Sequence, residues 1–247
     1  MRRRAEPSQG VFVVEGKLAL QAVLASAYPL LSVLVLERRQ EVLAELPVPA
    51  GVPVYVVGDD IMRQVAGFDV HRGVLALARR LPPCDPAELV SRDGPLVVVE
   101  AVNDQENLGA IFRNAAAFGA GAVLLDPTCA DPLYRRSVRV SLGHVLGVPF
   151  ARLSPWPTAL DLVERGGRVL LALTPDADAE PVQSAAAELH GVQVALAVGN
   201  EGAGLSPAVL ARARRVRIPM ARGVDSVNVA AATAVALHRF AQLGGAG

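Results

Sequence analysis

The architecture of this chain is set by residues 218–232, which read IPMARGVDSVNVAAA. A strand that reaches Ile218 must end there, because Pro219 fixes φ and lacks an N–H, so a central strand cannot continue through it. Gly223 permits a sharp turn. Ser226 and Asn228 are helix-capping residue types that precede an alanine-rich segment. The stretch therefore predicts a strand end, a polar loop and a helix, which is how ligand loops are built in α/β proteins.

Composition supports a globular chain with an aliphatic core. Of 247 residues, 52% are hydrophobic and only 4% aromatic, and the formal net charge is zero. Any binding of nucleic acid must therefore come from local basic patches. One such patch is Arg2, Arg3 and Arg4, which is either a basic tail or an arm that contacts phosphates.

The two cysteines and the apolar segments exclude several classes of protein. Cys84 and Cys129 are far apart and form no CxxC pair, so neither a zinc site nor a disulfide framework is indicated. No cluster of His, Cys and carboxylates has metal-ligand spacing, so we expect no metal. The N-terminus lacks a signal-peptide pattern, and no apolar run approaches the ~18 residues of a membrane span. These features predict a reduced, cytoplasmic protein without a membrane partner.

A segment rich in Pro, Asp and Gly, residues 81–95, divides the chain and predicts a linker with a short helical piece. Residues 1–80 before it predict a small α/β substrate-binding domain. Its expected helices cover residues 16–27 and 59–66, and its expected strands cover residues 32–36, 52–57 and 74–78.

Residues 96–247 predict a second α/β domain. Apolar runs predict strands over residues 96–102, 122–125, 150–153, 169–173 and 194–198, and helical spacing predicts helices over residues 108–118, 155–165 and 227–243. Strands that alternate with helices imply a mostly parallel sheet with helices on both faces. We find no internal repeat.

Three polar loops follow predicted strands: residues 103–115 (NDQENLGAIFRNA), residues 199–206 (GNEGAGLS) and the opening stretch, which follows the strand that ends at Ile218. Together and in this order, they resemble the motifs of the SpoU/TrmH branch of the SPOUT RNA 2′-O-ribose methyltransferases. The resemblance covers about residues 95–243. The N-terminal part resembles the family's substrate-binding domain through residues 14–16 (VEG) and 71–74 (HRGV).

The resemblance implies a C-terminal trefoil knot, a homodimer formed through the C-terminal domain, and S-adenosylmethionine held in a bent shape. Carried over to this sequence, the cofactor pocket comprises Thr174, Gly199, Ile218, Val227 and Asn228. Glycine lets backbone approach a ligand, and apolar side chains can hold a flat adenine. The catalytic set that the resemblance implies is Asn107, Arg113, Glu201, Ser226 and Asn228.

Each catalytic candidate also has a structural alternative. The family's motif-one arginine, here Arg113, is often proposed as the base, but a guanidinium with a pKa above 12 is a poor base. We expect Arg113 to hold a phosphate or ribose and to stabilise the developing oxyanion. The alternative is an ion pair with Glu201 or with a helix carboxylate.

The remaining catalytic candidates lie at loops and helix starts. Asn107 either caps its helix, lies near the reacting ribose, or does both. Glu201 orients Arg113 or the substrate, or is a solvated carboxylate. Ser226 and Asn228 either cap the last helix alone or lie beside the cofactor and the target hydroxyl.

Residues in two further segments are candidates for RNA binding. Arg135, Arg136 and Arg139 follow one another at a loop-to-helix junction and could contact backbone phosphates, or they form an ordinary solvated helix face. His71 lies either on the RNA face of the N-terminal domain or in a simple turn.

The predicted function is S-adenosylmethionine-dependent 2′-O-methylation of a ribose in structured RNA, with ribosomal (large-subunit) RNA the first choice. A methylase that confers antibiotic resistance is a narrower variant of this function. The alternatives are a tRNA ribose methyltransferase, a catalytically idle RNA-binding or ribosome-assembly factor, and a small-molecule methyltransferase. A nicotinamide enzyme is disfavoured because residues 199–204 (GNEGAG) lack the G-x-G-x-x-G spacing.

Overall fold

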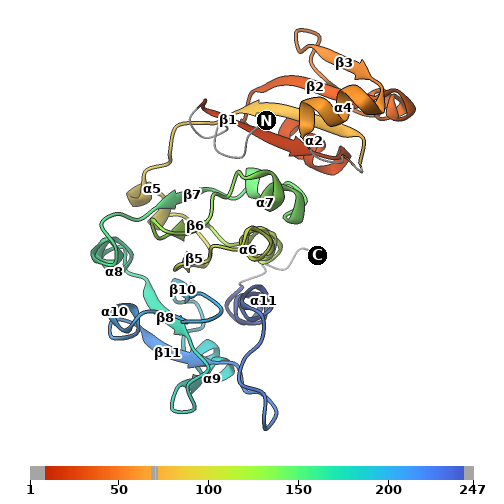
Figure 1. The fold of residues 1–247 in the computed structure, drawn as a ribbon. Helices are drawn as coiled ribbons and strands as arrows, with labels where there is room; N and C mark the ends of the chain where they lie inside the picture. The colour runs from red at the N-terminus through yellow and green to blue at the C-terminus, as the bar shows by residue number, and fades with distance from the viewer. Residues whose placement is uncertain (1–8, 68–69, 71, 242–247) are drawn as a thin grey trace, which may run out of the picture. The chain divides into compact units, whose positions relative to one another are not determined.

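The computed structural model describes residues 9–67, 70 and 72–241 (Figure 1). The chain forms two compact units, Met1–Pro82 with Asp131–Gly147, and Pro83–Ala130 with Val148–Gly247. The division into domains at residues 81–95 stays a prediction. Residues 131–147, which we expected in the C-terminal domain, group with the first unit. Within the described residues, no helix is long and apolar enough to cross a membrane.

The first unit contains a mixed four-stranded sheet in the order β1-β4-β2-β3. Its strands are β1 (Val11–Glu15), β2 (Leu30–Leu36), β3 (Val54–Val57) and β4 (Val74–Arg79), and its helices are α2 (Lys17–Leu24), α3 (Glu41–Ala44), α4 (Asp59–Ala66) and α7 (Arg135–Val140). Strand β4 is antiparallel to β1 and β2, whereas β3 is parallel to β2. Helix α4 has the predicted bounds, and it ends at Gly67 with a left-handed φ of 71°.

Helix α7 is held in the first unit by ion pairs and by close packing. The carboxylate of Glu15, only 2% exposed, pairs with Arg135 and lies 3.8 Å from Nη1 of Arg139. Gly143, just beyond α7, has a φ of 85°, and a Cβ there would lie 2.3 Å from the Cβ of Ala22 on α2. Only glycine therefore fits at this contact.

The second unit contains a seven-stranded sheet in the order β7-β6-β5-β10-β8-β11-β9, and every neighbouring pair is parallel (Figure 1). Its strands are β5 (Leu96–Val99), β6 (Ala122–Leu125), β7 (Phe150–Arg152), β8 (Val169–Leu173), β9 (Glu180–Pro181), β10 (Val194–Val198) and β11 (Arg214–Arg217). Every residue of β5, β6 and β10 is buried, as expected for central parallel strands. The bounds predicted for β6, β8 and β10 are confirmed.

Helices cover both faces of this sheet. One face packs against α5 (Pro86–Val90), α8 (Asp161–Arg165) and α10 (Pro207–Leu210) through one aliphatic cluster. Helices α6 (Gln105–Ala117), α9 (Val182–Glu188) and α11 (Val229–Phe240) complete the unit, and α11 contacts β10 as well as α6 and α9. The amide of Asn114 on α6 donates to the carbonyl of Ala230 on α11, at 2.7 Å.

Several predicted boundaries are wrong, most of them by one to three residues. The strand expected over residues 96–102 ends at Val99, because Ala101 has a left-handed φ of 55° that no strand accommodates. The helix expected from residue 108 begins at Gln105. The helix expected over residues 155–165 is a 3₁₀ turn at Thr158–Leu160 followed by α8, and the last helix begins at Val229 and ends at Phe240.

Candidate functional site

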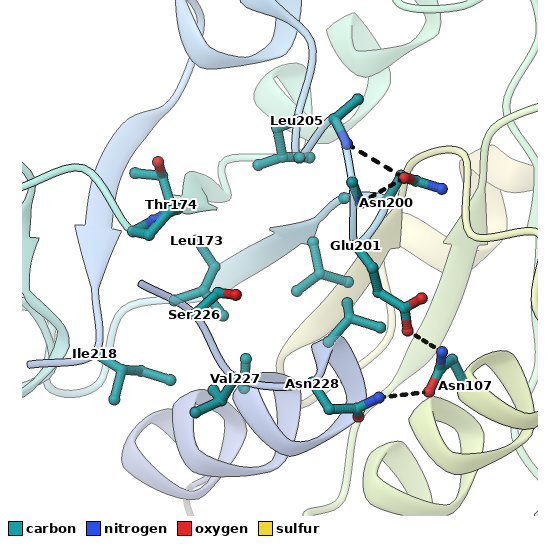
Figure 2. Close-up of a pocket in the computed structure, with 18 of the residues that line it drawn as sticks. Asn107, Leu173, Thr174, Asn200, Glu201, Leu205, Ile218, Ser226, Val227 and Asn228 are labelled. Carbon is teal, nitrogen blue, oxygen red and sulfur yellow. Dashed lines mark hydrogen bonds between the residues drawn. The ribbon is translucent and has the colours of Figure 1, made fainter. Parts of the chain in front are cut away.

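The carboxyl ends of β5, β10, β8 and β11 lie side by side in the second unit, and the loops that follow them surround one cavity. The cavity has a volume of about 1000 Å³, enough for a ligand of cofactor size. All three polar loops identified in the sequence contribute lining residues. The lining residues include Gly199 and the labelled side chains of Asn107, Thr174, Glu201, Ile218, Ser226, Val227 and Asn228 (Figure 2).

A chain of hydrogen bonds crosses the three loops (Figure 2). Oδ1 of Asn228 accepts from the N–H groups of Ala230 and Ala231, at 2.9 and 3.2 Å, which leaves its Nδ2 to donate to Oδ1 of Asn107 at 2.8 Å. Nδ2 of Asn107 then donates to the Glu201 carboxylate. Because helix α11 fixes the first amide, the orientation of each following group is determined.

The cap of helix α6 is Asp104, not Asn107. The Asp104 carboxylate accepts from the N–H groups of Glu106 and Asn107, both at 2.9 Å. The side chain of Asn107 is therefore not used in capping and reaches the cavity. Asn228, by contrast, caps α11 and also contacts the loops.

The five residues predicted to hold the cofactor all line the cavity. Ile218 is half-buried, and Val227 leaves 46% of its surface exposed, so both offer apolar area to a ligand. Gly199 is required for a reason other than ligand approach: a Cβ there would lie 2.4 Å from the carbonyl of Gly204. The loop can close on itself only over a glycine.

The charge of the lining is entirely negative. Among the described residues around the cavity are five carboxylates and no Lys, Arg or His; the carboxylates belong to Asp104, Glu106, Asp176, Glu201 and Asp225. Asp176 lies 3.6 Å from Arg215, whereas Glu201 is hydrogen-bonded to an amide. Such a lining favours a cationic ligand over one that carries phosphates.

Arg113, the fifth residue of the expected catalytic set, does not line the cavity formed by its own chain. It is exposed on α6 and is not among the cavity residues, since six residues of helix place it about 9 Å along the axis from Asn107. Within the described part of the chain its guanidinium makes no hydrogen bond or ion pair. The ion pair with Glu201 that we considered as an alternative is not formed, because Glu201 accepts from Asn107 instead.

The candidate RNA-binding residues are in the first unit. Arg135 and Arg139 face the buried carboxylate of Glu15, and Arg136 is exposed. His71 lies outside the described residues, as do Arg2, Arg3 and Arg4. No group of His, Cys, Asp and Glu in the described residues could hold a metal ion.

Sequence reasoning missed the residues that support the cavity loops. Glu100 follows the apolar run of β5 directly, is 6% exposed, and accepts from Nε1 of Trp156 and from the N–H of Ser206, both at 2.7 Å. Asn200 donates to the carbonyl of Ala101 at 3.0 Å. The sequence did contain a signal for Glu100: a carboxylate directly after a buried strand must itself be buried, and it then requires hydrogen-bond donors from neighbouring segments.

The sequence is similar to those of several known proteins. The chain is 45% identical over 237 residues to a Mycobacterium bovis protein described as an uncharacterized tRNA/rRNA methyltransferase, which covers 96% of this chain and 82% of that protein. It is 30% identical over 189 residues to a 23S rRNA (adenosine(1067)-2′-O)-methyltransferase of Streptomyces azureus, with 76% and 69% covered.

A solved structure also resembles the whole chain. The SpoU methyltransferase AviRb from Streptomyces viridochromogenes, in complex with the cofactor AdoMet, has a TM-score of 0.82 and 25% identity, with 97% of this chain and 93% of that one covered. The model of the SpoU rRNA Methylase family matches residues 94–238, which include all three loops. The chain therefore belongs to the SpoU rRNA Methylase family.

Proposed function

We propose that this protein is an S-adenosylmethionine-dependent RNA 2′-O-ribose methyltransferase that acts on structured RNA, with ribosomal (large-subunit) RNA the first choice. The observation that carries the proposal is one cavity at the strand ends, to which all three family loops bring Asn107, Glu201, Ser226 and Asn228. The AdoMet complex of AviRb and the 23S rRNA activity named for the Streptomyces azureus relative support it.

The lining of the cavity fits S-adenosylmethionine. Leu173, Ile218 and Val227 provide apolar surface for the adenine, and the carboxylates suit a ligand with a sulfonium and an ammonium group. Thr174, Gly199 and Asn228 are the polar and backbone positions that would hold the remainder. A nicotinamide dinucleotide, with its two phosphates, would meet five carboxylates and, in the described lining, no cation.

When bound, S-adenosylmethionine supplies an electrophilic methyl group. The residues of the chain position the ribose and accept a hydrogen bond from its 2′-hydroxyl group. Asn107 holds one oxygen of Glu201, so the other oxygen remains to accept a hydrogen bond from the ribose 2′-hydroxyl. Asn228 fixes Asn107, and Ser226, two residues before Asn228, is the further polar group beside the target hydroxyl.

The homodimer is part of the proposal because the cavity of one chain does not contain Arg113. We place its interface on the exposed surface of α6 and α11, where Arg113 and Ala117 of α6 and Ala231 and Val235 of α11 are exposed. A second copy would then supply the guanidinium that binds a phosphate or ribose. The trefoil knot and the cytoplasmic location remain predictions of the family resemblance.

Mixed dimers test the origin of Arg113. We expect Arg113→Ala and Glu201→Gln each to abolish methyl transfer, and equal mixing with subunit exchange to restore about a quarter of wild-type activity, since statistical pairing makes half of the dimers mixed and gives each one intact site. Activity that stays absent in a mixture shown by mass spectrometry to contain mixed dimers would place Arg113 and Glu201 in the same subunit's site.

The activity itself is tested by transfer of labelled methyl from S-adenosylmethionine to total RNA, followed by nuclease mapping of the resistant 2′-O-methyl linkage. Label in large-subunit rRNA supports the first choice, and label in tRNA supports the alternative. If calorimetry shows no binding of S-adenosylmethionine, the protein is instead an idle RNA-binding or assembly factor.

A further inference from the structure

We propose that Glu100 and Ala101, two consecutive residues outside the family loops, are positioning residues that hold the loop of residues 199–206 in its ligand-binding shape. The inference rests on the proposed function for the identity of the ligand, but its geometry is independent of that function. Both residues follow β5 directly, and each contacts one end of the loop that carries Glu201.

Ala101 fixes the beginning of the loop. Its φ of 55° is a left-handed conformation that is unfavourable for alanine. In this conformation its N–H donates to the buried Asp126 carboxylate at 3.1 Å, and its carbonyl accepts from Nδ2 of Asn200 at 3.0 Å. Oδ1 of Asn200 also accepts from the N–H groups of Gly202 and Ala203, in the turn that follows Glu201. The strained residue thereby sets the path of the backbone around Glu201.

Glu100 fixes the end of the same loop. Its carboxylate is buried, and in the described structure it has no cationic partner; one oxygen accepts from the indole N–H of Trp156 and the other from the N–H of Ser206. Two donors of fixed position therefore require two acceptor oxygens. Because Ser206 also caps α10, the carboxylate joins the loop to a helix and to the sheet.

The isosteric substitution Glu100→Gln tests this role. It leaves one acceptor for two donors, so that either Ser206 or Trp156 faces an NH₂ group. We expect faster amide exchange in residues 199–206 of the ligand-free protein, while the buried strand β10 exchanges as in the wild type. Unchanged exchange in the loop would overturn the inference, whether or not the protein binds S-adenosylmethionine.

Ligand binding gives the second measurement. We expect Glu100→Gln to weaken S-adenosylmethionine binding about tenfold in calorimetry. The control is Glu188→Gln, which removes a carboxylate of α9 that pairs with Arg214 of β11 and does not line the cavity; this variant should bind as the wild type does. Equal affinity of wild type and Glu100→Gln overturns the inference, whereas a wild type that does not bind contradicts the proposed function and leaves the exchange measurement to decide.

A second substitution distinguishes positioning from a general loss of stability. In Glu100→Gln with Trp156→Phe, the indole donor is absent, so the remaining oxygen of Gln is free to accept from Ser206. We expect loop exchange and affinity to return toward those of Trp156→Phe alone. If the double variant is as impaired as the sum of both single variants, the coupling through Glu100 is refuted.

Trp156 is the only tryptophan in the sequence and gives a spectroscopic readout. Because its indole N–H contacts the carboxylate that holds the loop, we expect S-adenosylmethionine to change the emission of the wild type. The change should be reduced in Glu100→Gln at saturating ligand. An identical change in both proteins would contradict the proposed link.

Discussion

At the scale of single residues, the site depends on amide orientation. An asparagine amide has a donor and an acceptor end, and only its surroundings determine which way it points. Helix α11 determines this for Asn228, and Asn228 in turn determines it for Asn107. The sequence indicated both asparagines as site residues. It could not show that Asn228 donates to Asn107 and Asn107 to Glu201, because these hydrogen bonds join segments that are far apart in the sequence.

The substitution Asn228→Asp separates capping from this orienting role. An aspartate still caps the helix and suits its N-terminus, but it presents an oxygen to the oxygen of Asn107. We expect unchanged thermal stability and a loss of about a hundredfold in single-turnover methyl transfer, because Glu201 is displaced. Asn228→Ala should also lose about 1 kcal/mol of stability through the missing cap. Wild-type activity in the aspartate variant would leave capping as the only role of Asn228.

The two cysteines should differ in reactivity. Burial raises the pKa of the Cys129 thiol to about 12, and the nearby Asp126 carboxylate acts in the same direction. The raised pKa means that this group stabilises the fold below its unfolded pKa of about 8.5 and that the contribution is lost as the pH rises above it. We expect a thiol reagent at pH 8 to modify only the exposed Cys84 in the native protein and both cysteines after unfolding. Equal rates in the native protein would contradict this.

At the scale of elements, buried strands were the most predictable feature. Three strands have the predicted bounds because a strand covered on both faces must be continuously apolar. The opening stretch predicts a strand that ends at Ile218, and β11 ends one residue earlier, at Arg217; its sequence, RRVR, has no apolar pattern from which its start could be predicted. Its arginines are accommodated because Arg214 pairs with Glu180 and Glu188, and Arg215 with Asp178. The helix expected over residues 155–165 starts late because Pro157 disfavours the α-helical conformation of the residue before it, Trp156.

A buried arginine connects the linker to the sheet. Arg168, at the start of β8, is 5% exposed and donates to the carbonyls of Val90, Arg92 and Gly94. Burial lowers its pKa, although the group stays charged at neutral pH. The linker is thus held by side-chain donors that its own sequence does not reveal.

Arg168→Met should therefore destabilise the fold strongly. The substitution keeps much of the apolar volume but leaves these carbonyls without their donor, at a cost of about 3 kcal/mol in the free energy of unfolding. Arg165→Met is the matched control: Arg165 is exposed on α8 and donates to a carbonyl of its own helix, so a change within about 0.5 kcal/mol is expected. Urea denaturation measures the stability of both variants. Similar midpoints would contradict the view that the hydrogen bonds of Arg168 hold the linker.

At the scale of the whole molecule, the first unit takes in residues from the middle of the sequence. Residues 131–147 leave the second unit after β6 and return to it before β7. The arginines that we expected to contact RNA therefore have different surroundings: Arg135 pairs with the buried Glu15, whereas Arg136 is exposed. Their roles should differ accordingly.

Arg135→Gln and Arg136→Gln separate stability from RNA binding. The first leaves a buried carboxylate without its closest cation and should cost about 3 kcal/mol of stability. The second, at an exposed side chain, should cost less stability than the first and should lower the slope of log K against log salt by about one, if Arg136 contacts a phosphate. Thermal melting and RNA titrations at several salt concentrations measure both effects. An unchanged slope for Arg136→Gln would remove this residue from the RNA interface.

The sequence by itself determined the parallel sheet, the bounds of three of its strands and the three polar loops beside the cavity, because buried strands and loops after strands leave local patterns of apolar and polar residues. It could not determine which residue caps α6, that Arg113 stands outside the cavity of its own chain, or that residues 131–147 belong with the first unit. Those features depend on contacts between segments up to 121 residues apart, such as that of Asn107 with Asn228. Only the tertiary structure brings such segments together, and a local pattern carries no trace of a distant partner.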